Sequence, residues 1–366
     1  MRIDKGRISG LQFMFLIACY YQASSLLTAF QTGVTKQDTW IMVLIGSILS
    51  LPFLWAVRTL MVTFPDKNLI QILSEVYGPV IGKILGLLYL WYFLTVASLN
   101  LMDLADFTKG TIMTRTPSPV MAAVCILVAS IAVRRGIRLV AKYGPLFTII
   151  AAFIFVLSTL LVVNQIKLEH YLPIFSLPPK KYLQGAHIST TIPFGEHITF
   201  LMIHPAALLS RRDTGKYLFL GFAVGALTLF ITTLRDIGVL GNTVDLFTVP
   251  SLMTLRLVHV GPTISRTEIL FSVIFMILLF FKITVLFYVT VLTVAQLFNI
   301  KSYQHLILTV GSLIVVYGIT LYPNPQKHAA SAQEVEPVIW TLFELFIPLL
   351  TSIVAKIRKL PKVKEA

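Results

Sequence analysis

The sequence predicts an all-α polytopic membrane protein, because it combines an apolar composition, long apolar runs and few charges. Of its 366 residues, 56% are hydrophobic and only 13% are charged, whereas an average soluble domain is about 45–50% apolar and about 25% charged. This composition excludes a soluble globular enzyme, a disordered chain and a secreted disulfide scaffold. The runs are also too continuous for the alternating strands of an outer-membrane barrel.

The apolar runs predict ten membrane spans, because roughly 20 apolar residues cross a bilayer. The spans cover about Ile8–Gln31, Trp40–Leu60, Val80–Met102, Pro119–Val133, Leu139–Val163, His187–Leu209, Tyr217–Leu240, Ile269–Leu297, Tyr303–Tyr322 and Val338–Ile357. Asn68–Tyr77 predicts a helix lying on the membrane surface, and Thr243–Val260 a surface helix or re-entrant segment. No secretory signal peptide is visible, so we expect the first span to stay in the mature protein.

The net charge of +14 indicates membrane topology here and not a nucleic-acid partner. Lys and Arg residues lie mostly in short connections, and they favour the connections that share a side with the N-terminus. We therefore expect both termini in the cytoplasm. Arg235 is assigned to an outer connection in this scheme. Cys19 and Cys125 lie in separate apolar runs and are predicted to be small apolar fillers.

Two of the predicted spans contain residues that interrupt a helix. In the first span, Ala23, Ser24 and Ser25 follow Tyr20-Tyr21-Gln22. This run indicates either an unwound stretch whose backbone faces a ligand or a helix that a neighbour approaches closely. In the sixth span, Pro193, Phe194, Gly195 and Glu196 place two helix-breaking residues beside an ionisable group. A functional break is the favoured interpretation there, and a purely structural kink is the alternative.

Charged residues at mid-span are costly and need partners. Lys282 lies near the centre of the eighth span, and Glu196 lies near the centre of the sixth. The simplest hypothesis is that they meet in a polar interior cavity. The alternatives are separate backbone partners or a neutral form of one group. Tyr92 and Val96 share a face of the third span, whereas Asp103 and Asp106, at its outer end, are interpreted as solvated charges.

The interrupted spans are the first and the sixth, so they occupy the same position in two halves of five spans. Interrupted segments at corresponding positions are typical of inverted-repeat transporters, whose solute site lies between the broken helices. The sequence therefore predicts a single transmembrane domain with a LeuT-like 5+5 inverted repeat. The first repeat is expected at about residues 8–165 and the second at about 185–358.

Short motifs spread over the chain resemble those of spore germinant-receptor B subunits, the GerAB-type spore permease family of the amino-acid/polyamine/organocation superfamily. The motifs are Ile8-Ser9-x-Leu11-Gln12, Ala23-Ser24-Ser25-Leu26-Leu27, Ala132-Val133-Arg134-Arg135-Gly136-Ile137, Ile192-Pro193-Phe194-Gly195-Glu196, Leu201-Met202-Ile203-x-Pro205, Arg266-Thr267-Glu268 and Phe280-Phe281-Lys282. The resemblance covers essentially the whole chain. One position departs from it, because members usually carry Gly where this sequence has Ala23.

The resemblance implies a subunit that senses a small germinant, commonly an amino acid, in the spore inner membrane. Its partners would be a larger A-type membrane subunit and a C-type lipoprotein, and no cofactor or metal is implied. The ligand pocket carried over by motif comprises Ala23, Ser24, Ser25, Tyr92, Val96, Pro193, Phe194, Gly195, Glu196 and Lys282. Specificity would come from a few polar groups in an otherwise apolar cavity.

A working secondary transporter is the second hypothesis, with Glu196 or Lys282 exchanging protons while an amino acid is carried. Both hypotheses need the same pocket, so the sequence does not separate them. A membrane enzyme is disfavoured, because the chain has no H-E-x-x-H, no G-x-S-x-G and no paired Asp motif at mid-span.

Overall fold

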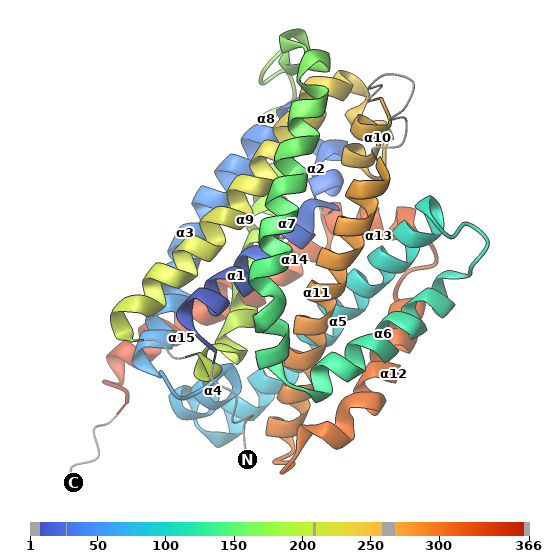
Figure 1. Cartoon of the computed structure of the whole chain (residues 1–366). Coiled ribbons are helices and arrows are strands. Elements are labelled where there is room, and N and C mark those ends of the chain that lie inside the picture. The colour runs from blue at the N-terminus through green and yellow to red at the C-terminus, as the bar shows by residue number, and fades with distance from the viewer. Residues whose placement is uncertain (1–7, 27, 208–209, 258–267, 362–366) are drawn as a thin grey trace.

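The fold is a bundle of helices, seen in a computed structural model of the chain (Figure 1). The structure describes residues 8–26, 28–207, 210–257 and 268–361. Within these ranges the only β pairing is an isolated bridge between Ile8 and Ala207. The predicted all-α class is therefore confirmed.

The helices follow the predicted spans closely. The α-helices are α1 (Gly10–Gln22), α2 (Thr28–Thr35), α3 (Thr39–Thr63), α4 (Leu69–Tyr77), α5 (Pro79–Thr111), α6 (Ser118–Arg134), α7 (Ile137–Val162), α8 (Pro179–Thr191), α9 (Arg211–Leu240), α10 (Pro250–Arg256), α11 (Glu268–Leu297), α12 (Ile307–Leu321), α13 (Pro325–Glu334), α14 (Glu336–Thr341) and α15 (Ile347–Ile357). The 3₁₀ segments are η1 (Ala23–Leu26), η2 (Lys36–Asp38), η3 (Val163–Gln165), η4 (Leu168–Tyr171), η5 (Phe194–Met202), η6 (His204–Ala206), η7 (Gly241–Leu246) and η8 (Tyr303–Leu306), and η9 (Leu342–Phe346) is a π-helical turn.

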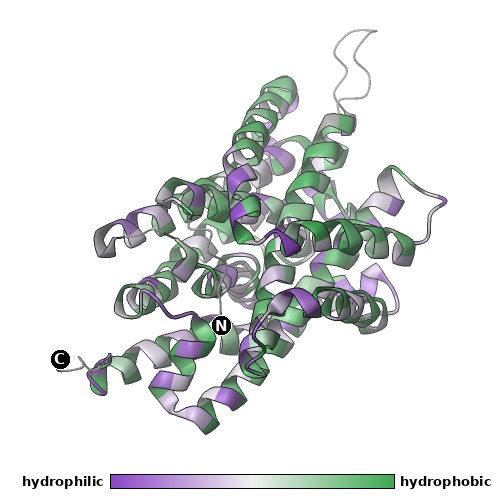
Figure 2. Ribbon diagram, turned by 60° about the horizontal axis from the view of Figure 1, so that its bottom comes forward, coloured by the Kyte–Doolittle hydropathy of each residue, from purple (hydrophilic) through white to green (hydrophobic). Residues whose placement is uncertain are grey.

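Seven helices in the described part of the chain are long and apolar enough to cross a membrane, and α6 is a shorter apolar helix. Hydrophobic residues predominate along the helices, and hydrophilic residues gather mostly at their ends and connections (Figure 2). The chain is therefore an integral membrane protein. The helices of the first and sixth predicted spans, α1 and α8, have only 13 residues each. Ten crossings remains a prediction.

Two of the connecting segments test the surface-helix predictions. Asn68–Tyr77 does form a helix, α4, whose start is fixed by a capping box between Asn68 and Gln71. Thr243–Val260 is not one helix: it divides into η7 and α10, and residues 258–260 lie outside the described ranges. The division has a local cause, because Pro250 has a fixed φ that suits the first position of a new helix, α10. In Figure 1, α4 and α10 lie at opposite ends of the bundle.

The centre of the bundle is α11, which packs against α1, α5, α6 and α7. Most of its side chains from Phe271 to Leu297 are buried. A helix that is apolar on all sides is stable only where neighbours surround it. Lys282 is the one charged residue between Phe271 and Leu297, and the fold buries it completely (0% exposed). The central helix therefore places one cation in the middle of the protein.

Candidate ligand-binding site

The first interruption begins where α1 ends at Gln22. The next residues, Ala23, Ser24 and Ser25, belong to the tighter turn η1, and the helical direction resumes with α2 at Thr28. All three residues are buried. Serine forms helices poorly because its hydroxyl competes for backbone hydrogen bonds. The predicted break in the first span is confirmed, and position 27 lies outside the described ranges.

The second interruption has a clear cause in Pro193. A residue before proline avoids the helical region, and Ile192 is extended (φ −110°, ψ 106°), so α8 ends at Thr191. The chain continues as η5, a 3₁₀ helix of nine residues, rather than as an α-helix. The carbonyl of Ile192 accepts a hydrogen bond from Gln31 Nε2 (3.1 Å). The first interrupted segment thus satisfies a backbone group freed by the second.

Lys282 and Glu196 meet between these two interruptions, which confirms the predicted pairing, although only Glu196 lines a cavity there. Both carboxylate oxygens of Glu196 lie 2.9 Å from Lys282 Nζ. Lys282 also donates to Ser24 Oγ (2.9 Å). The three side chains come from η5, α11 and η1, and each is at most 4% exposed. A buried ion pair is tolerated when its remaining donors and acceptors are satisfied, and Ser24 contributes to that requirement.

Tyr20, on the last turn of α1, completes the surroundings of the pair. Its hydroxyl donates to Glu196 Oε2 (2.5 Å), and its ring centroid lies 4.8 Å from Lys282 Nζ. The ring face therefore attracts the ammonium group while the hydroxyl stabilises the carboxylate. The sequence places Tyr20 beside Ala23-Ser24-Ser25, but it does not assign this residue to the pocket.

Glu344 is another buried carboxyl group near the pair, and it is not among the predicted pocket residues. It lies in the π-helical turn η9 and is 0% exposed. Tyr92 donates to its Oε1 (2.5 Å), whereas its Oε2 has no hydrogen-bond partner among the described residues. The sequence does contain a signal for Glu344, because this residue lies inside the predicted span Val338–Ile357. An ionisable residue inside a span indicates a functional site by default.

The remaining predicted pocket residues lie in different surroundings. Val96 lines a small cavity next to Glu196. Gly195 lies against Glu344, and Pro193 precedes η5 as its N-cap. Phe194 packs instead among aromatic rings, 5.6 Å from the ring centroid of Phe222. Of the predicted pocket residues, only Val96 and Glu196 line that cavity.

The cavity beside the pair is small, about 20 Å³. Its lining residues are Phe30, Val96, Leu99, Asn100, Asp103, Ile192, Glu196, His328, Glu336, Trp340 and Glu344. A water molecule needs roughly 10–15 Å³ measured this way. The cavity therefore holds about one water molecule, and a solute the size of an amino acid requires the surrounding helices to separate.

A larger vestibule of about 340 Å³ adjoins this cavity. The two share three lining residues: Phe30, Asp103 and His328. The rest of the vestibule is formed by the end of α5, by α10 with the residues before it, and by the start of α13. These shared side chains lie between the vestibule and the cavity, and we call them the gate residues.

Asp103 differs from its sequence interpretation as a solvated charge. It is 8% exposed, and its Oδ1 lies 3.2 Å from His328 Nδ1 on α13. Glu336 Oε1 lies 3.7 Å from the other ring nitrogen of His328. Burial alone lowers the pKa of His328, but the two carboxylates outweigh it and raise that pKa to about 9. The prediction was wrong because it omitted α13, which places His328 against Asp103.

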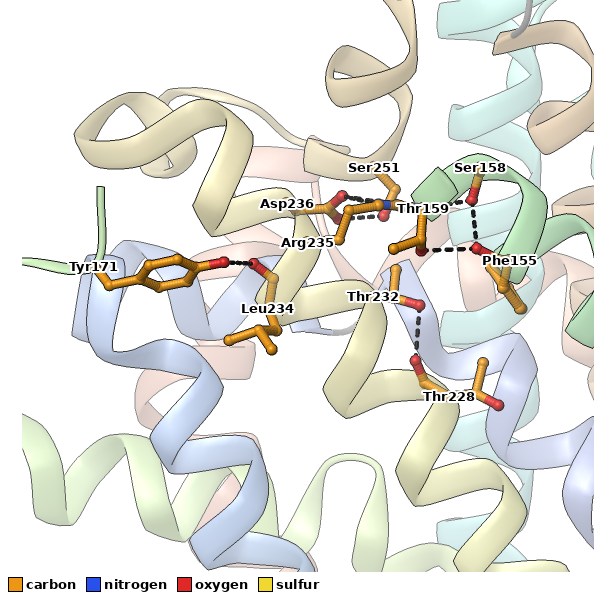
Figure 3. Close-up of polar contacts among 10 residues, drawn as sticks. All are labelled: Phe155, Ser158, Thr159, Tyr171, Thr228, Thr232, Leu234, Arg235, Asp236 and Ser251. Atoms are coloured by element: carbon orange, nitrogen blue, oxygen red, sulfur yellow. Dashed lines mark hydrogen bonds and ion pairs between the residues drawn. The ribbon is translucent and has the colours of Figure 1, made fainter. Parts of the chain in front are cut away.

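A further buried polar cluster forms around Arg235 and Asp236 (Figure 3). Arg235 donates from Nε and Nη2 to Asp236 Oδ1 (2.9 and 2.7 Å), and from Nη1 to Ser158 (2.5 Å). Ser251 donates to Asp236 Oδ2. The assignment of Arg235 to an outer connection was wrong: it is 2% exposed within α9. The cluster joins α9 to α7 and α10.

The geometry defines a class of protein. Two interrupted helices meet at a buried ion pair in an all-helical membrane bundle, and solved transporters share the fold of this bundle. The structure resembles the nucleobase-cation-symport-1 transporter Mhp1 in a closed conformation with bromovinylhydantoin bound, with a TM-score of 0.65, 14% identity and coverage of 93% of this chain and 78% of that one. A Na⁺-coupled sialic acid symporter gives a TM-score of 0.65, 10% identity, and 93% and 79% coverage. The predicted LeuT-like fold is confirmed.

The sequence narrows this class to one family. The profile described as "Spore germination protein" matches residues 7–328, so the chain belongs to the spore germination protein family of spore permeases. It is 27% identical to spore germination protein KB of Bacillus subtilis (strain 168), over 99% of this chain and 98% of that protein. The chain is therefore a transporter-like membrane protein of spore germination.

Proposed function

We propose that this chain is the germinant-sensing membrane subunit of a spore germination receptor and that it binds a small solute, an amino acid, between its two interrupted helices. The observation that supports this proposal most is the contact of Lys282 with both Ser24 and Glu196. One hydroxyl, one ammonium and one carboxylate from three elements converge where both helices are interrupted. Such a set can orient a zwitterion, because each end of the solute finds a group of opposite charge.

Sensing requires two arrangements of the bundle with different affinities for the solute. The cavity of about 20 Å³ is too small for an amino acid, and the adjoining vestibule of about 340 Å³ is not. A solute that enters from the vestibule would favour an arrangement in which the gate residues separate. The partner subunits would detect this change.

The setting of the receptor follows from the family resemblance. We place the chain in the spore inner membrane with both termini in the cytoplasm, beside an A-type membrane subunit and a C-type lipoprotein. With this orientation the vestibule opens away from the cytoplasm. The bundle would form one domain of two repeats, at about residues 8–165 and 185–358.

A proton-coupled amino-acid transporter is the second candidate. It is favoured by the likeness to symporters and by Glu344, a buried carboxyl group with one oxygen that is unpaired among the described residues and could carry a proton. Uptake of labelled amino acids by the purified chain in proteoliposomes separates the candidates. Gradient-driven accumulation would favour transport, and binding without accumulation would favour sensing.

Germination of spores tests the leading proposal. Deleting the gene and challenging the spores with a panel of amino acids and sugars identifies the germinant, because only responses that need this chain are lost. Ser24→Leu should then abolish that response while the protein still accumulates in the membrane. Gly195→Leu should abolish it too, with less protein in the membrane, because the added side chain meets Glu344. The fall in absorbance of the spore suspension measures the response.

Ser312→Leu is the matched control, because Ser312 is exposed on the outer face of α12. It should leave the response unchanged. A normal dose–response in both pocket variants would show that the germinant does not bind at this position.

A further inference from the structure

We propose that Glu344 and Asn100 form the subsite for a protonated amine, so that the pocket selects solutes carrying an ammonium group. This inference rests on the proposed function and assigns its ligand chemistry to residues that the family motifs do not include. It starts from two unsatisfied atoms. Glu344 Oε2 and Asn100 Oδ1 are buried acceptors without a hydrogen-bond partner in the described chain, and both residues line the small cavity.

Unpaired buried acceptors are costly, and each is expected to have a role. The amide of Asn100 is oriented by its own donor, because Nδ2 donates to the carbonyl of Val96 (2.9 Å). Its Oδ1 is therefore left as an acceptor. Glu344 is fixed in the same way through Oε1, which accepts from Tyr92. Asn100 Oδ1 is an acceptor, and so is Glu344 Oε2 whenever the carboxyl group is ionised, so the complementary ligand group is a hydrogen-bond donor.

The charge around the cavity identifies the donor as a cation. Four carboxyl groups line it, from Asp103, Glu196, Glu336 and Glu344. Among the described residues, the opposing cations are His328 in the lining and Lys282, which is paired with Glu196. The excess of carboxylates favours a ligand with positive charge, because opposite charges attract strongly where little water screens them. An ammonium group meets both requirements, since it carries three donors and a full charge.

The position of Glu344 also suits a specific contact. The π-helical turn η9 inserts an irregularity into the last span, and such turns frequently occur at functional sites. Tyr89 donates to the carbonyl of Phe343 (2.7 Å), which holds the neighbouring backbone of that turn. Gly195 leaves the space that the Glu344 carboxylate occupies. The acceptor is thus held in place by two tyrosines and one glycine before a ligand arrives.

Thermal unfolding of the full-length chain in lipid nanodiscs tests the inference with four probes: propylamine, L-alanine, propionate and potassium chloride. Propylamine and L-alanine should each raise the unfolding temperature in a saturable way, whereas propionate and potassium chloride should not. Glu344→Gln should weaken the apparent affinity for propylamine about tenfold or more, because the probe loses a charge-assisted hydrogen bond. Asn100→Leu should weaken it in the same direction, which covers the case that Glu344→Gln does not fold.

Glu75→Gln is the matched control, because it makes the same change on α4, in a partly exposed pair with Lys67. It should leave the affinity unchanged. A shift by potassium chloride that Glu344→Gln removes would assign a bare cation and overturn the ammonium subsite. Equal affinities in wild type and Glu344→Gln, or no shift with either amine, would also overturn it. A different result would be that propionate raises the unfolding temperature in a way that Ser24→Leu removes and Glu344→Gln does not. That result would contradict the ammonium subsite and would still support the proposed pocket.

Discussion

Gly195 lies directly against the carboxylate of Glu344, so the glycine of the second interruption and the buried acid of the last span share one space. A Cβ at position 195 would come 2.8 Å from Glu344 Cδ and still closer to its Oε2. The reason for a glycine here is therefore this close approach, and not backbone conformation alone. The sequence shows Gly195 as a helix breaker, and the structure adds its contact.

Gly195→Ala should destabilise the protein by about 1–3 kcal/mol, the usual cost of overpacking a filled interior. The added methyl group meets a carboxylate held by Tyr92, so neither side yields easily. Chemical unfolding in detergent measures the loss. The double variant Gly195→Ala, Glu344→Ala should recover part of it, because the clash is gone. Additive losses in the double variant would show that the contact is not the cause.

Lys282→Met should cost about 3–5 kcal/mol of stability, because Glu196 then stays buried without its cation. The double variant Lys282→Met, Glu196→Gln should be more stable than Lys282→Met alone, since no uncompensated charge is left. Unfolding of the three proteins by the same method gives the coupling between the two positions. A coupling near zero would contradict the pairing.

Sequence reasoning located the two interruptions and the ion pair because each rests on a local signal. Pro193 cannot continue a helix, and Lys282 and Glu196 are charges in apolar runs that need partners. The same rule predicts a functional role for Glu344, which is also an ionisable residue inside a predicted span. The π-helical turn that contains Glu344 could not be predicted in this way, because the spacing of hydrophobic residues does not indicate such a turn.

The wrong assignments concern long-range contacts. Asp103 lies near the end of a predicted span, and only the docking of α13 buries it against His328. Arg235 and Asp236 follow one another near the end of an apolar run, which is the usual pattern of a connection. Their partners Ser158 and Ser251 lie 77 and 15 residues away along the chain. A local sequence pattern does not predict contacts over such separations.

The Arg235 cluster is expected to contribute to stability without taking part in ligand recognition. Asp236→Asn should lower stability by about 3–5 kcal/mol, because the guanidinium group of Arg235 stays buried beside a neutral amide. The concentration of germinant giving half the maximal spore response should stay the same at permissive temperature. Asp213→Asn, the same change at the start of α9, is the control and should lower stability much less. A large shift in that concentration with Asp236→Asn would place the cluster in the recognition pathway.

The gate residue His328 should make stability depend on pH in the alkaline range. Asp103 and Glu336 contact the imidazole, Asp106 lies near it, and the ring of Tyr322 stacks on it. Because the folded protein raises the pKa of His328 to about 9 from a usual 6.5, the protonated form stabilises the fold. Protonated His328 adds on the order of 3 kcal/mol to the free energy of unfolding, and this contribution is fully present below about pH 6.5. It is lost as the pH rises through about 9.

His328→Gln provides the measurement. Unfolding temperatures of wild type and variant, recorded between about pH 6 and pH 10, should differ most at the acidic end and converge above about pH 9. Titration of groups elsewhere in the chain affects both proteins equally, so the difference isolates the imidazole. The contacts of His328 would loosen over the same range as the ring loses its charge and its attraction to the carboxylates. Parallel curves for the two proteins would mean that His328 is uncharged in the folded protein.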